Sequence, residues 1–386
     1  MKKLISTQSN QTTSYSWTPS VCKDGHVSIV QWNPKKESFL SISSSECRVW
    51  KQSKQKQWEA TICLGHTKKI TCADWHPNGE IFITGSIDTS CRIWKYNKPN
   101  QWISTAYKDH FQSLNDIRWH SNGLMFVSAS EDNSCLVWKK DLKNKWTSQR
   151  CLGHSHRITS VSWHPKQQTF VSASFDKTCR IWKENSAGKW NSICLIGHSG
   201  FINHVDWHPS KNMILSSSFD KTCMIWELGQ DNEWVGTQKH GHNHWVYSAK
   251  WHSNGQLFVS CSYDTTCRVW SQNQKNHWTS EVCEGHTKSV DSVSWHPYKE
   301  QFISISQDNT CRIWKKNRLN KWPSIVLNGH SSDITDVDWH SRKELIVSGS
   351  YDKICLVWTL KEKNQSINRY FTKRYMLFLE TFINNQ

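Results

Sequence analysis

Apolar residues are scarce in this chain of 386 residues. Hydrophobic residues make up only 36% of it, below the usual share of a globular domain. No apolar run reaches the roughly 18 residues that a membrane-spanning helix needs, so a transmembrane helix is not predicted. Residues 1–13 are polar and have no apolar stretch after Lys2 and Lys3. A secretory signal is therefore not predicted either.

The motifs that would give the cysteines and histidines a chemical role are also missing. The chain has 15 cysteines but no Cys-x-x-Cys, no glycine-rich phosphate loop and no nucleophile motif. We therefore predict no catalytic site, no metal and no cofactor. Small buried hydrophobes in a reduced protein explain the cysteines best. The expected location is the cytoplasm, with nuclear or cytoskeletal association left open.

What the chain does have is tryptophan, 25 residues in all, on a regular spacing. Gly-His pairs recur every 44 residues, with Asp109-His110 at the one exception, and a Trp follows nine residues after each His. Two further Trp complete each unit, so eight units of three Trp leave only Trp245 outside the pattern. Such self-similarity is the signature of a repeat architecture.

Each unit contains four short β-prone segments separated by turn residues. In one unit these are residues 158–163, 170–174, 179–182 and 190–195. Four strands with a Gly-His start and a Trp end resemble a WD40 blade. The resemblance covers nearly the whole chain, and it implies an all-β WD40 β-propeller that works as a non-catalytic scaffold for other proteins.

The WD40 resemblance also implies a buried hydrogen-bond network in each blade. A loop His, a strand Ser or Thr, a turn Asp and a strand Trp would satisfy one another. Asp-His-Ser sets resemble catalytic triads, but seven buried copies favour a structural role. The matching residues are His66, Thr84, Asp88, Trp94, His154, Ser172, Asp176, Trp182, His198, Ser216, Asp220, Trp226, His286, Ser304, Asp308, Trp314, His330, Ser348, Asp352 and Trp358.

The two ends of the repeat predict how the ring closes. The chain begins with a fourth-type strand near residues 15–22 and ends with a third-type strand at 355–358. Pairing them closes eight four-stranded blades and removes an open sheet edge. Seven blades plus a displaced first unit is the alternative. The first unit lacks the turn Asp, having Ser44-Ser45, so its network is expected to be incomplete and its blade the least regular.

These boundaries divide the chain into three parts. Residues 1–13 are expected to be a polar arm, 14–359 the propeller, and 360–386 a tail. Apolar residues recur at helical spacing in the tail, which predicts an amphipathic helix that packs on the propeller, binds a partner groove or touches a membrane surface, the first two being favoured over the third.

The net charge of +16 favours acidic partners. The lysines concentrate in loops that would lie on one face of a propeller, giving a basic face. Solvation of exposed loops explains this face as well as docking to an acidic surface does. Specific recognition of nucleic acid is not predicted, because no additional aromatics interleave with the lysines. The basic face comprises Lys139, Lys140, Lys143, Lys145, Lys183, Lys315 and Lys316.

The opposite face carries the turn aspartates, and the residue before each varies. Several of these residues and their neighbours are aromatic, and exposed aromatics are candidate binding hot spots. The predicted protein-binding face comprises Phe111, Glu131, Phe175, Phe201, Phe219, Trp245, Tyr263 and Tyr351.

Finer resemblances suggest two kinds of complex. Two features resemble the cytosolic iron–sulfur assembly WD-repeat protein, whose family docks client apoproteins. They are the fourth-strand Trp followed by Cys and Gly-His, and the stretch 172–176. That family has seven blades and an Arg where this chain has Glu131. Residues 207–209 and 221–226 are similar to the WD-repeat subunit of the actin-nucleating complex, whose late insertion is absent here. The latter resemblance implies a cytoskeletal or ciliary role.

Overall fold

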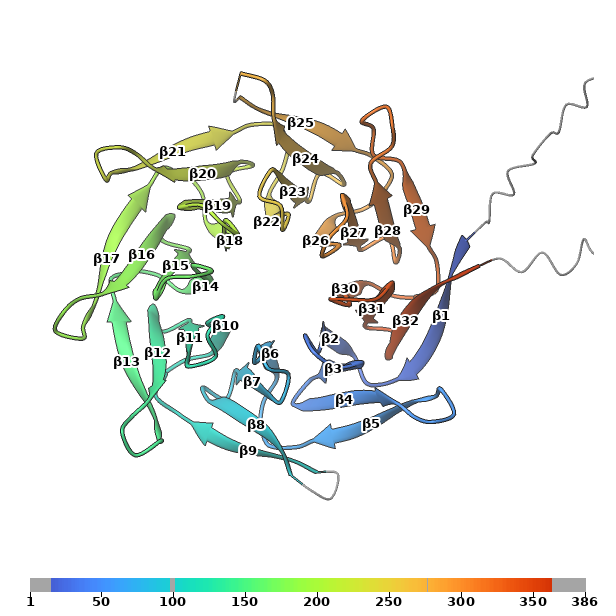
Figure 1. The fold of residues 1–386 in the computed structure, drawn as a ribbon, viewed down its shortest axis with the longest axis horizontal. Helices are drawn as coiled ribbons and strands as arrows, with labels where there is room; N and C mark the ends of the chain where they lie inside the picture. The colour runs from blue at the N-terminus through green and yellow to red at the C-terminus, as the bar shows by residue number, and fades with distance from the viewer. Residues whose placement is uncertain (1–14, 98–100, 276, 363–386) are drawn as a thin grey trace, which may run out of the picture.

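The computed structural model describes residues 15–97, 101–275 and 277–362. These residues form 32 β-strands in eight four-stranded antiparallel sheets, arranged as blades around a central channel (Figure 1). The prediction of an eight-bladed, all-β propeller is confirmed. No helix within these ranges has the length and apolarity to cross a membrane. The tail predicted to be helical lies almost wholly outside the described residues.

The blades are numbered in chain order, and their strands are named from the channel outward. Blade 1 is β2 (Val27–Trp32), β3 (Ser38–Ser43), β4 (Glu46–Gln52) and β5 (Trp58–Cys63); blade 2 is β6 (Ile70–Trp75), β7 (Ile81–Ser86), β8 (Cys91–Asn97) and β9 (Gln101–Tyr107). Blade 3 is β10 (Leu114–Trp119), β11 (Met125–Ser130), β12 (Ser134–Lys140) and β13 (Trp146–Leu152); blade 4 is β14 (Ile158–Trp163), β15 (Thr169–Ser174), β16 (Thr178–Glu184) and β17 (Trp190–Ile196). Blade 5 is β18 (Ile202–Trp207), β19 (Met213–Ser218), β20 (Cys223–Leu228) and β21 (Trp234–Lys239); blade 6 is β22 (Val246–Trp251), β23 (Leu257–Ser262), β24 (Cys267–Gln272) and β25 (Trp278–Cys283). Blade 7 is β26 (Val290–Trp295), β27 (Gln301–Ser306), β28 (Cys311–Lys315) and β29 (Ser324–Leu327); blade 8 is β30 (Ile334–Trp339), β31 (Leu345–Ser350), β32 (Ile354–Glu362) and β1 (Tyr15–Lys23).

Blade 8 is the one blade built from both ends of the chain. β1 pairs antiparallel with β32 in continuous register, from Tyr15 opposite Glu362 to Lys23 opposite Ile354. The first strand of the chain thus supplies the outer strand of the last blade, which is the predicted closure. Closure leaves no blade with a missing strand.

Burial explains why tryptophan can replace aliphatic residues in this core. Every residue of strands such as β11, β15 and β19 is buried, whereas outer strands such as β5 and β21 alternate with solvent. In blade 2, Phe82 stacks on Trp94 at 5.6 Å between ring centroids and also contacts Trp102 at 4.9 Å. Large aromatic areas therefore fill the interior of each blade.

Blade 1 has its own polar network, which differs from the incomplete one that was predicted. The indole Nε1 of Trp50 donates to Ser41 Oγ at 2.8 Å, as in other blades. Ser41 in turn bonds to Asp24, and Arg48 forms an ion pair with the same carboxylate. Asp24 takes the place of the loop His because it approaches from the loop before β2. These four residues therefore satisfy one another's buried polar groups in blade 1.

Candidate functional site: the upper face and the channel

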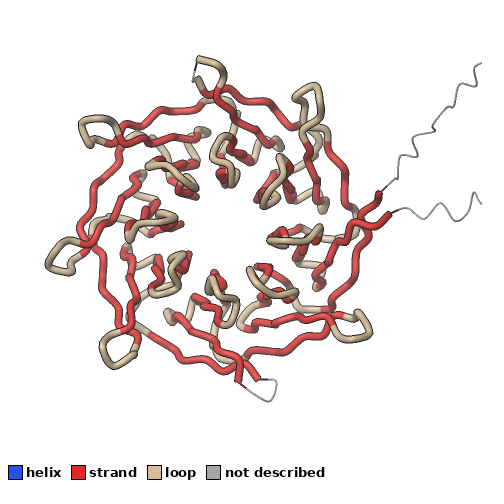
Figure 2. The backbone as a smooth tube through the Cα atoms, in the orientation of Figure 1, coloured by secondary structure: helices blue, strands red, loops and turns tan. Residues whose placement is uncertain are grey.

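The loops of the propeller lie on two faces, which we call upper and lower. The upper face carries the loops that lead into each innermost strand and the tight turns between second and third strands. The lower face carries the other two loops of each blade, including the long hairpins that Figure 2 shows at the outer rim. The predicted protein-binding residues belong to the upper face and the predicted basic residues to the lower.

The upper face is held rigid by the hydrogen-bond networks beneath it. In blade 3, His110 Nδ1 lies 2.8 Å from Asp132 Oδ2, and His110 Nε2 lies 2.9 Å from Ser128 Oγ. Trp138 Nε1 donates to the same serine oxygen at 2.9 Å. The same three contacts recur in blades 2 and 4 to 8, at the residues that the 44-residue spacing selects. The turns that display the upper-face side chains are therefore fixed from below.

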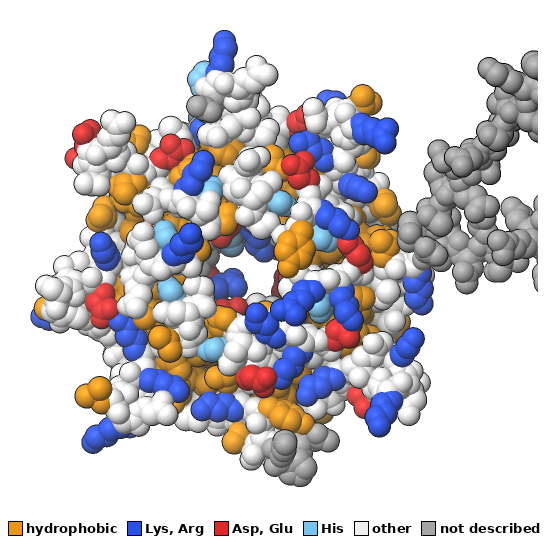
Figure 3. All heavy atoms as spheres, in the orientation of Figure 1, with side chains coloured by type: hydrophobic (Ala, Val, Ile, Leu, Met, Phe, Trp, Pro, Cys, Tyr) orange, Lys and Arg blue, Asp and Glu red, His pale blue; other side chains and the backbone are white. Residues whose placement is uncertain are grey.

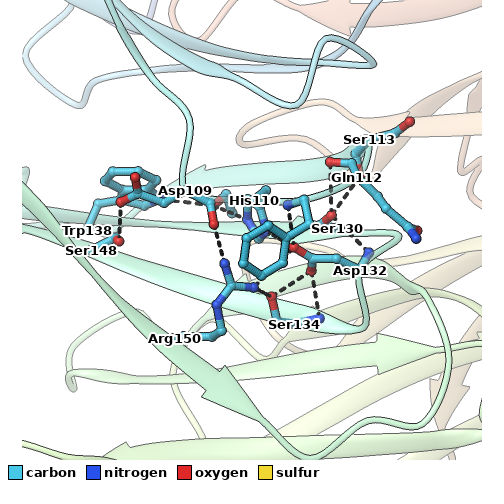
Figure 4. A network of polar contacts seen from close by, with 12 residues as sticks. Asp109, His110, Gln112, Ser113, Ser130, Asp132, Ser134, Trp138, Ser148 and Arg150 are labelled. Carbon is cyan, nitrogen blue, oxygen red and sulfur yellow. Dashed lines mark hydrogen bonds and ion pairs between the residues drawn. The ribbon is translucent and has the colours of Figure 1, made fainter.

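Blade 3 shows how the exceptional Asp109 is accommodated (Figure 4). Asp109 accepts a hydrogen bond from Ser148 at 2.5 Å, and Arg150 bonds to its carbonyl oxygen. Arg150 also donates to Asp132 at 3.1 Å, so it joins the blade network from the outer strand. Asp109 is therefore held through its side chain by Ser148 and through its carbonyl oxygen by Arg150.

In blade 7 the network aspartate is held ionised and its histidine neutral. Burial alone would raise the pKa of Asp308, but hydrogen bonds from Thr310, His286 and the Thr287 amide lower it to about 2. Burial lowers the pKa of His286 despite the adjacent carboxylate. Each pair is buried beneath its turn and bonded on every side, which fits a structural role better than proton transfer to a substrate.

Five of the predicted upper-face residues form one continuous aromatic cluster on blades 4 to 6. Phe175 stacks on Phe201 at 4.4 Å, Phe219 stacks on Trp245 at 4.9 Å, and Phe175 contacts Phe219 edge-on at 6.1 Å. Trp245 also contacts Tyr263 at 5.8 Å. We call these five residues the aromatic cluster. Trp245 and Phe201 are each 40% exposed, so the rings are packed together yet accessible.

The other predicted upper-face residues lie apart from the aromatic cluster. Phe111 on blade 3 is 78% exposed, with the guanidinium of Arg150 over its ring at 4.5 Å. Glu131 lies 3.8 Å from Arg157, whose guanidinium also covers Phe175 at 3.8 Å. Tyr351 is on blade 8, where its carbonyl contacts His26. The prediction that these residues belong to a binding surface is untested by their positions.

A pocket of about 390 Å³ lies at the upper mouth of the channel, on blades 7, 8, 1 and 2 and away from the aromatic cluster on blades 4 to 6. Asp291, Asp333 and Tyr351 line it, together with Gln307, Lys69 and residues of blades 1 and 2. Tyr247 does not line this pocket; its ring contacts Phe219 of the cluster at 6.1 Å, and burial and the Asp291 carboxylate raise the pKa of its hydroxyl. We call this pocket the mouth pocket. Sequence reasoning missed it, since its residues are far apart in the chain.

Below the mouth pocket, the channel itself is lined with charged and polar side chains. A second cavity of about 390 Å³ shares Ile29 and Thr71 with the mouth pocket and is lined by residues of all eight blades. Its charged side chains are Asp116, Arg118, Lys250, Asp336 and Asp338, and His204 is also present. Burial raises the pKa of Asp338 to about 7, with the neighbouring Asp336 adding to the effect. Buried carboxylates therefore lie close together here.

Several channel aspartates hold neighbouring blades together. Each stands one residue before the Trp that ends an innermost strand, and it accepts a hydrogen bond from the amide of the equivalent Trp in the next blade. The distances are 2.7 Å from Trp119 to Asp74, 2.9 Å from Trp251 to Asp206 and 2.8 Å from Trp32 to Asp338. Ser162 accepts from the Trp207 amide in the same way, at 3.1 Å. We call these bonds blade clamps.

Where the residue before the Trp is longer, a different bond joins the blades. The indole Nε1 of the next Trp donates to the carbonyl oxygen of that residue: Trp75 to Gln31 at 3.3 Å, Trp163 to Arg118 at 3.0 Å and Trp295 to Lys250 at 2.9 Å. At the clamped seams the indole Nε1 atoms of Trp32, Trp119, Trp207 and Trp251 are buried without a protein partner. At each of these seven interfaces between neighbouring blades, either the amide or the indole of the Trp in the next blade therefore donates the hydrogen bond.

The lower face is basic, but many of its lysines already have partners. Lys139 forms an ion pair with Glu184 at 2.5 Å, and Lys316 pairs with Glu300 at 3.0 Å. Lys140 lies over the ring of Trp146 at 5.6 Å. Lysine and arginine side chains are spread around the visible face in Figure 3, with acidic side chains between them. The predicted basic face is therefore a mixed surface with a positive excess.

The cysteines lie in the sheets, all of them free and all but Cys194 buried. Sequence reasoning overlooked that third- and fourth-strand cysteines are directly opposite one another, as in Cys47 with Cys63 and Cys135 with Cys151. Burial raises the pKa of Cys63 and Cys151 to about 12, so their thiols stay protonated. In the three described ranges, no three His, Cys, Asp or Glu side chains are grouped to hold a metal ion.

The geometry defines a closed β-propeller whose repeats are tied by His–Ser–Trp–Asp networks. Seven segments match the family model described as WD domain, G-beta repeat: residues 58–95, 101–139, 146–183, 190–227, 234–271, 279–315 and 321–359. The chain belongs to the WD40 repeat family. The unmatched first unit is blade 1, where Asp24 replaces the loop His. No curated protein matches the chain closely enough to suggest which WD40 protein it resembles.

Proposed function

We propose that this protein is a non-catalytic platform that binds another protein through the aromatic cluster. The observation that carries this proposal is the contiguity of Phe175, Phe201, Phe219, Trp245 and Tyr263 across three blades. Trp and Tyr dominate the binding energy of protein interfaces, and aromatic rings packed together on a surface are expected to be covered by a partner. A WD40 propeller is consistent with this scaffold role.

The rigidity of the upper face supports the same proposal. Phe175, Phe219 and Tyr263 each directly precede a turn Asp whose carboxylate is bonded to a buried His. Because these turns are fixed in the free protein, little conformational entropy is lost when a partner binds.

The test is binding of the full chain to proteins captured from its own cells, followed by loss of that binding in Trp245→Ala. This variant should lower the affinity for a purified partner by about thirtyfold or more, as expected for a hot-spot Trp. Tyr298→Ala is the matched control, because Tyr298 is an aromatic residue 74% exposed on the lower face. Equal binding by both variants and the parent protein would refute the proposal.

An assembly role in cytosolic iron–sulfur protein maturation is the finer form of this proposal. It is supported by the sequence resemblances around residues 172–176. The eighth blade is a difference from that seven-bladed family. Purification of the tagged protein should recover apo forms of iron–sulfur enzymes. Recovery of partners with no cluster-binding protein among them would refute this finer role.

A cytoskeletal role through the basic face is the second candidate, favoured by the positive excess on the lower face. It predicts salt-sensitive co-sedimentation with acidic filaments. Lys140→Glu and Lys143→Glu together should reduce pelleting, because neither lysine has an ion-pair partner among the described residues. Unchanged pelleting would exclude this surface.

A further inference from the structure

An arginine extends the aromatic cluster at its blade 4 end. In blades 4 to 6 the amide of the residue before the turn Asp donates a hydrogen bond to the carbonyl oxygen of a residue in the loop before the innermost strand. These bonds join Phe175 to Arg157 at 3.1 Å, Phe219 to Phe201 at 2.9 Å and Tyr263 to Trp245 at 3.0 Å. Arg157 thus occupies in blade 4 the position that an aromatic residue occupies in blades 5 and 6. Its guanidinium lies over the Phe175 ring at 3.8 Å, so the cluster has a cation at one end.

The same pair of positions is not aromatic in the two adjoining blades. It holds Ser113 and Glu131 in blade 3, and Ser289 and Gln307 in blade 7. Polar residues therefore bound the cluster on both sides, and a segment that covers its rings lies over blades 4 to 6.

The upper-face loops and turns of blades 4 to 6 carry an excess of positive charge. They are residues 153–157, 175–177, 197–201, 219–221, 241–245 and 263–265, in which the turn aspartates are the only carboxylates. Those aspartates are already bonded to buried histidines. Lys177 and Lys221 each directly follow a turn Asp; both are exposed, and neither forms an ion pair with a described residue. Arg157 has Glu131 at 3.8 Å, but an ion pair between two partly exposed side chains is weak and leaves the guanidinium open to competition.

The packing of the rings favours a peptide over a nucleic acid as the occupant. Phe175 stacks on Phe201 at 4.4 Å, and Phe219 stacks on Trp245 at 4.9 Å. Single-stranded nucleic acids bind by stacking bases on free ring faces, and each of these four rings already has one face against a neighbour. Apolar side chains of a peptide pack against ring edges as well as ring faces. The exposed edges and the nearby cations therefore suit a peptide that combines apolar and acidic side chains.

We propose that the segment that docks on the aromatic cluster is an acidic peptide segment, an inference that rests on the proposed function. Its apolar side chains cover the rings, and its Asp or Glu side chains lie beside Lys177, Lys221 and Arg157. Opposite charges across an interface raise the association rate, whereas a basic segment meets like charges at the same positions. Because the lysines are exposed, the charge contribution is modest and weakens as salt is added.

The test selects peptides from a random displayed library on the full chain. The selected peptides should be enriched in Asp and Glu next to Leu, Phe or Trp. In fluorescence anisotropy, replacing the Asp and Glu of a selected peptide with Asn and Gln should weaken its binding by about tenfold. The affinity of the unchanged peptide should fall as the NaCl concentration is raised.

Two double variants assign the effect to the lysines beside the cluster. Lys177→Gln with Lys221→Gln should weaken binding of the acidic peptide by about tenfold and remove most of the difference between the acidic and the neutral peptide. Lys68→Gln with Lys353→Gln is the matched control, because it removes two exposed upper-face lysines from blades 2 and 8. Lys353 follows its turn Asp as Lys177 does. This control should leave the affinity within about twofold of the parent value, because distant exposed charges are screened.

The outcomes separate this inference from the proposed function. If the selected peptides depend on Trp245 but are not acidic, or bind the two double variants equally well, the proposed function stands and the acidic partner is refuted. A single-stranded oligothymidylate that binds more tightly than the peptides, and loses that binding in Trp245→Ala, would overturn the inference in favour of nucleic acid. If the peptides bind Trp245→Ala as well as the parent protein, or if no peptide binds, both proposals fail.

Discussion

Two sets of buried aspartates in this propeller have opposite electrostatic environments. The turn aspartates, such as Asp176 and Asp308, accept hydrogen bonds from His, from a hydroxyl and from backbone amides. The channel aspartates Asp206 and Asp338 accept the Trp amide of the next blade and have backbone donors and a cation nearby, but no side-chain hydroxyl or His donates to them. The pKa of Asp308 falls to about 2, whereas burial raises the pKa of Asp206 to about 6 and of Asp338 to about 7.

This contrast shows that burial alone does not decide the charge of a carboxylate. Donation by a His, a hydroxyl and backbone amides outweighs the desolvation of a turn aspartate, but backbone amides alone do not do so in the channel. The turn aspartates therefore stay ionised, whereas the channel aspartates take up a proton near neutral pH.

The largest expected effect comes from breaking a turn aspartate. Asp176→Ala leaves His154 and the Ser155 amide without their shared acceptor. We expect the free energy of unfolding to fall by about 3 kcal/mol, because a buried hydrogen-bonded network loses its charged member. Urea denaturation at neutral pH measures this loss. Asp206→Ala, which removes a channel carboxylate, should cost clearly less, and equal losses would contradict the contrast between the two sets.

Lowering the pH should change the stability contributions of the two sets of aspartates in opposite directions. The pKa values of turn aspartates such as Asp176 and Asp308, and of the histidines His154 and His286, are lowered, so their contributions are present above the unfolded values, near 4 and 6.5, and are lost as the pH falls below these values. The raised pKa values of the channel aspartates mean the reverse: their contribution is present below pH 4 and is lost as the pH rises through 6 to 7. Denaturation between pH 8 and pH 2.5 should show a modest change down to pH 4 and a steep loss below it.

A smaller effect isolates one channel residue. Asp338→Asn keeps an oxygen for the Trp32 amide but removes the charge. The variant should be about 1 kcal/mol more stable than the parent protein at pH 8, because no buried charge remains to be desolvated. The difference should disappear near pH 4.5, where Asp338 is already protonated. A stabilisation that persists at pH 4.5 would show that charge is not its cause.

The smallest effect concerns the blade clamp that uses a neutral residue. Ser162→Ala removes the acceptor for the Trp207 amide. A loss of about 0.5–1 kcal/mol is expected, the usual net value of one neutral hydrogen bond. Since Ser162 does not titrate, the loss should be the same at pH 5 and pH 8. A pH-dependent loss would indicate that the neighbouring Asp206 shares this seam.

The repeat made the fold predictable in unusual detail. The 44-residue spacing located the strands and the four residues of each network, because equivalent residues must occupy equivalent places in stacked blades. The pairing of β1 with β32 followed from counting strands. Blade 1 was mispredicted because Asp24 reaches the network from a loop that does not align with the Gly-His repeat.

The channel was harder to foresee from the sequence. The residue before each innermost-strand Trp differs between blades, for example Asp74, Arg118 and Lys250. The repeat pattern therefore does not indicate that this position joins neighbouring blades. Its role depends on a neighbour 44 or 45 residues away and on which donor of the next Trp is used. The aromatic cluster was partly foreseen as a set of residues, but its continuity from Phe175 to Tyr263 depends on how adjacent blades are placed.

The pairing of β1 with β32 also has a consequence for synthesis of the chain. β1 is synthesised more than 300 residues before its partner strand β32. Until then β1 has an unpaired edge, and blade 8 cannot be completed. Folding of the ring is thus coupled to completion of synthesis, and a product that ends before Ile354 would expose both an open blade and a free strand, the features that promote aggregation and degradation.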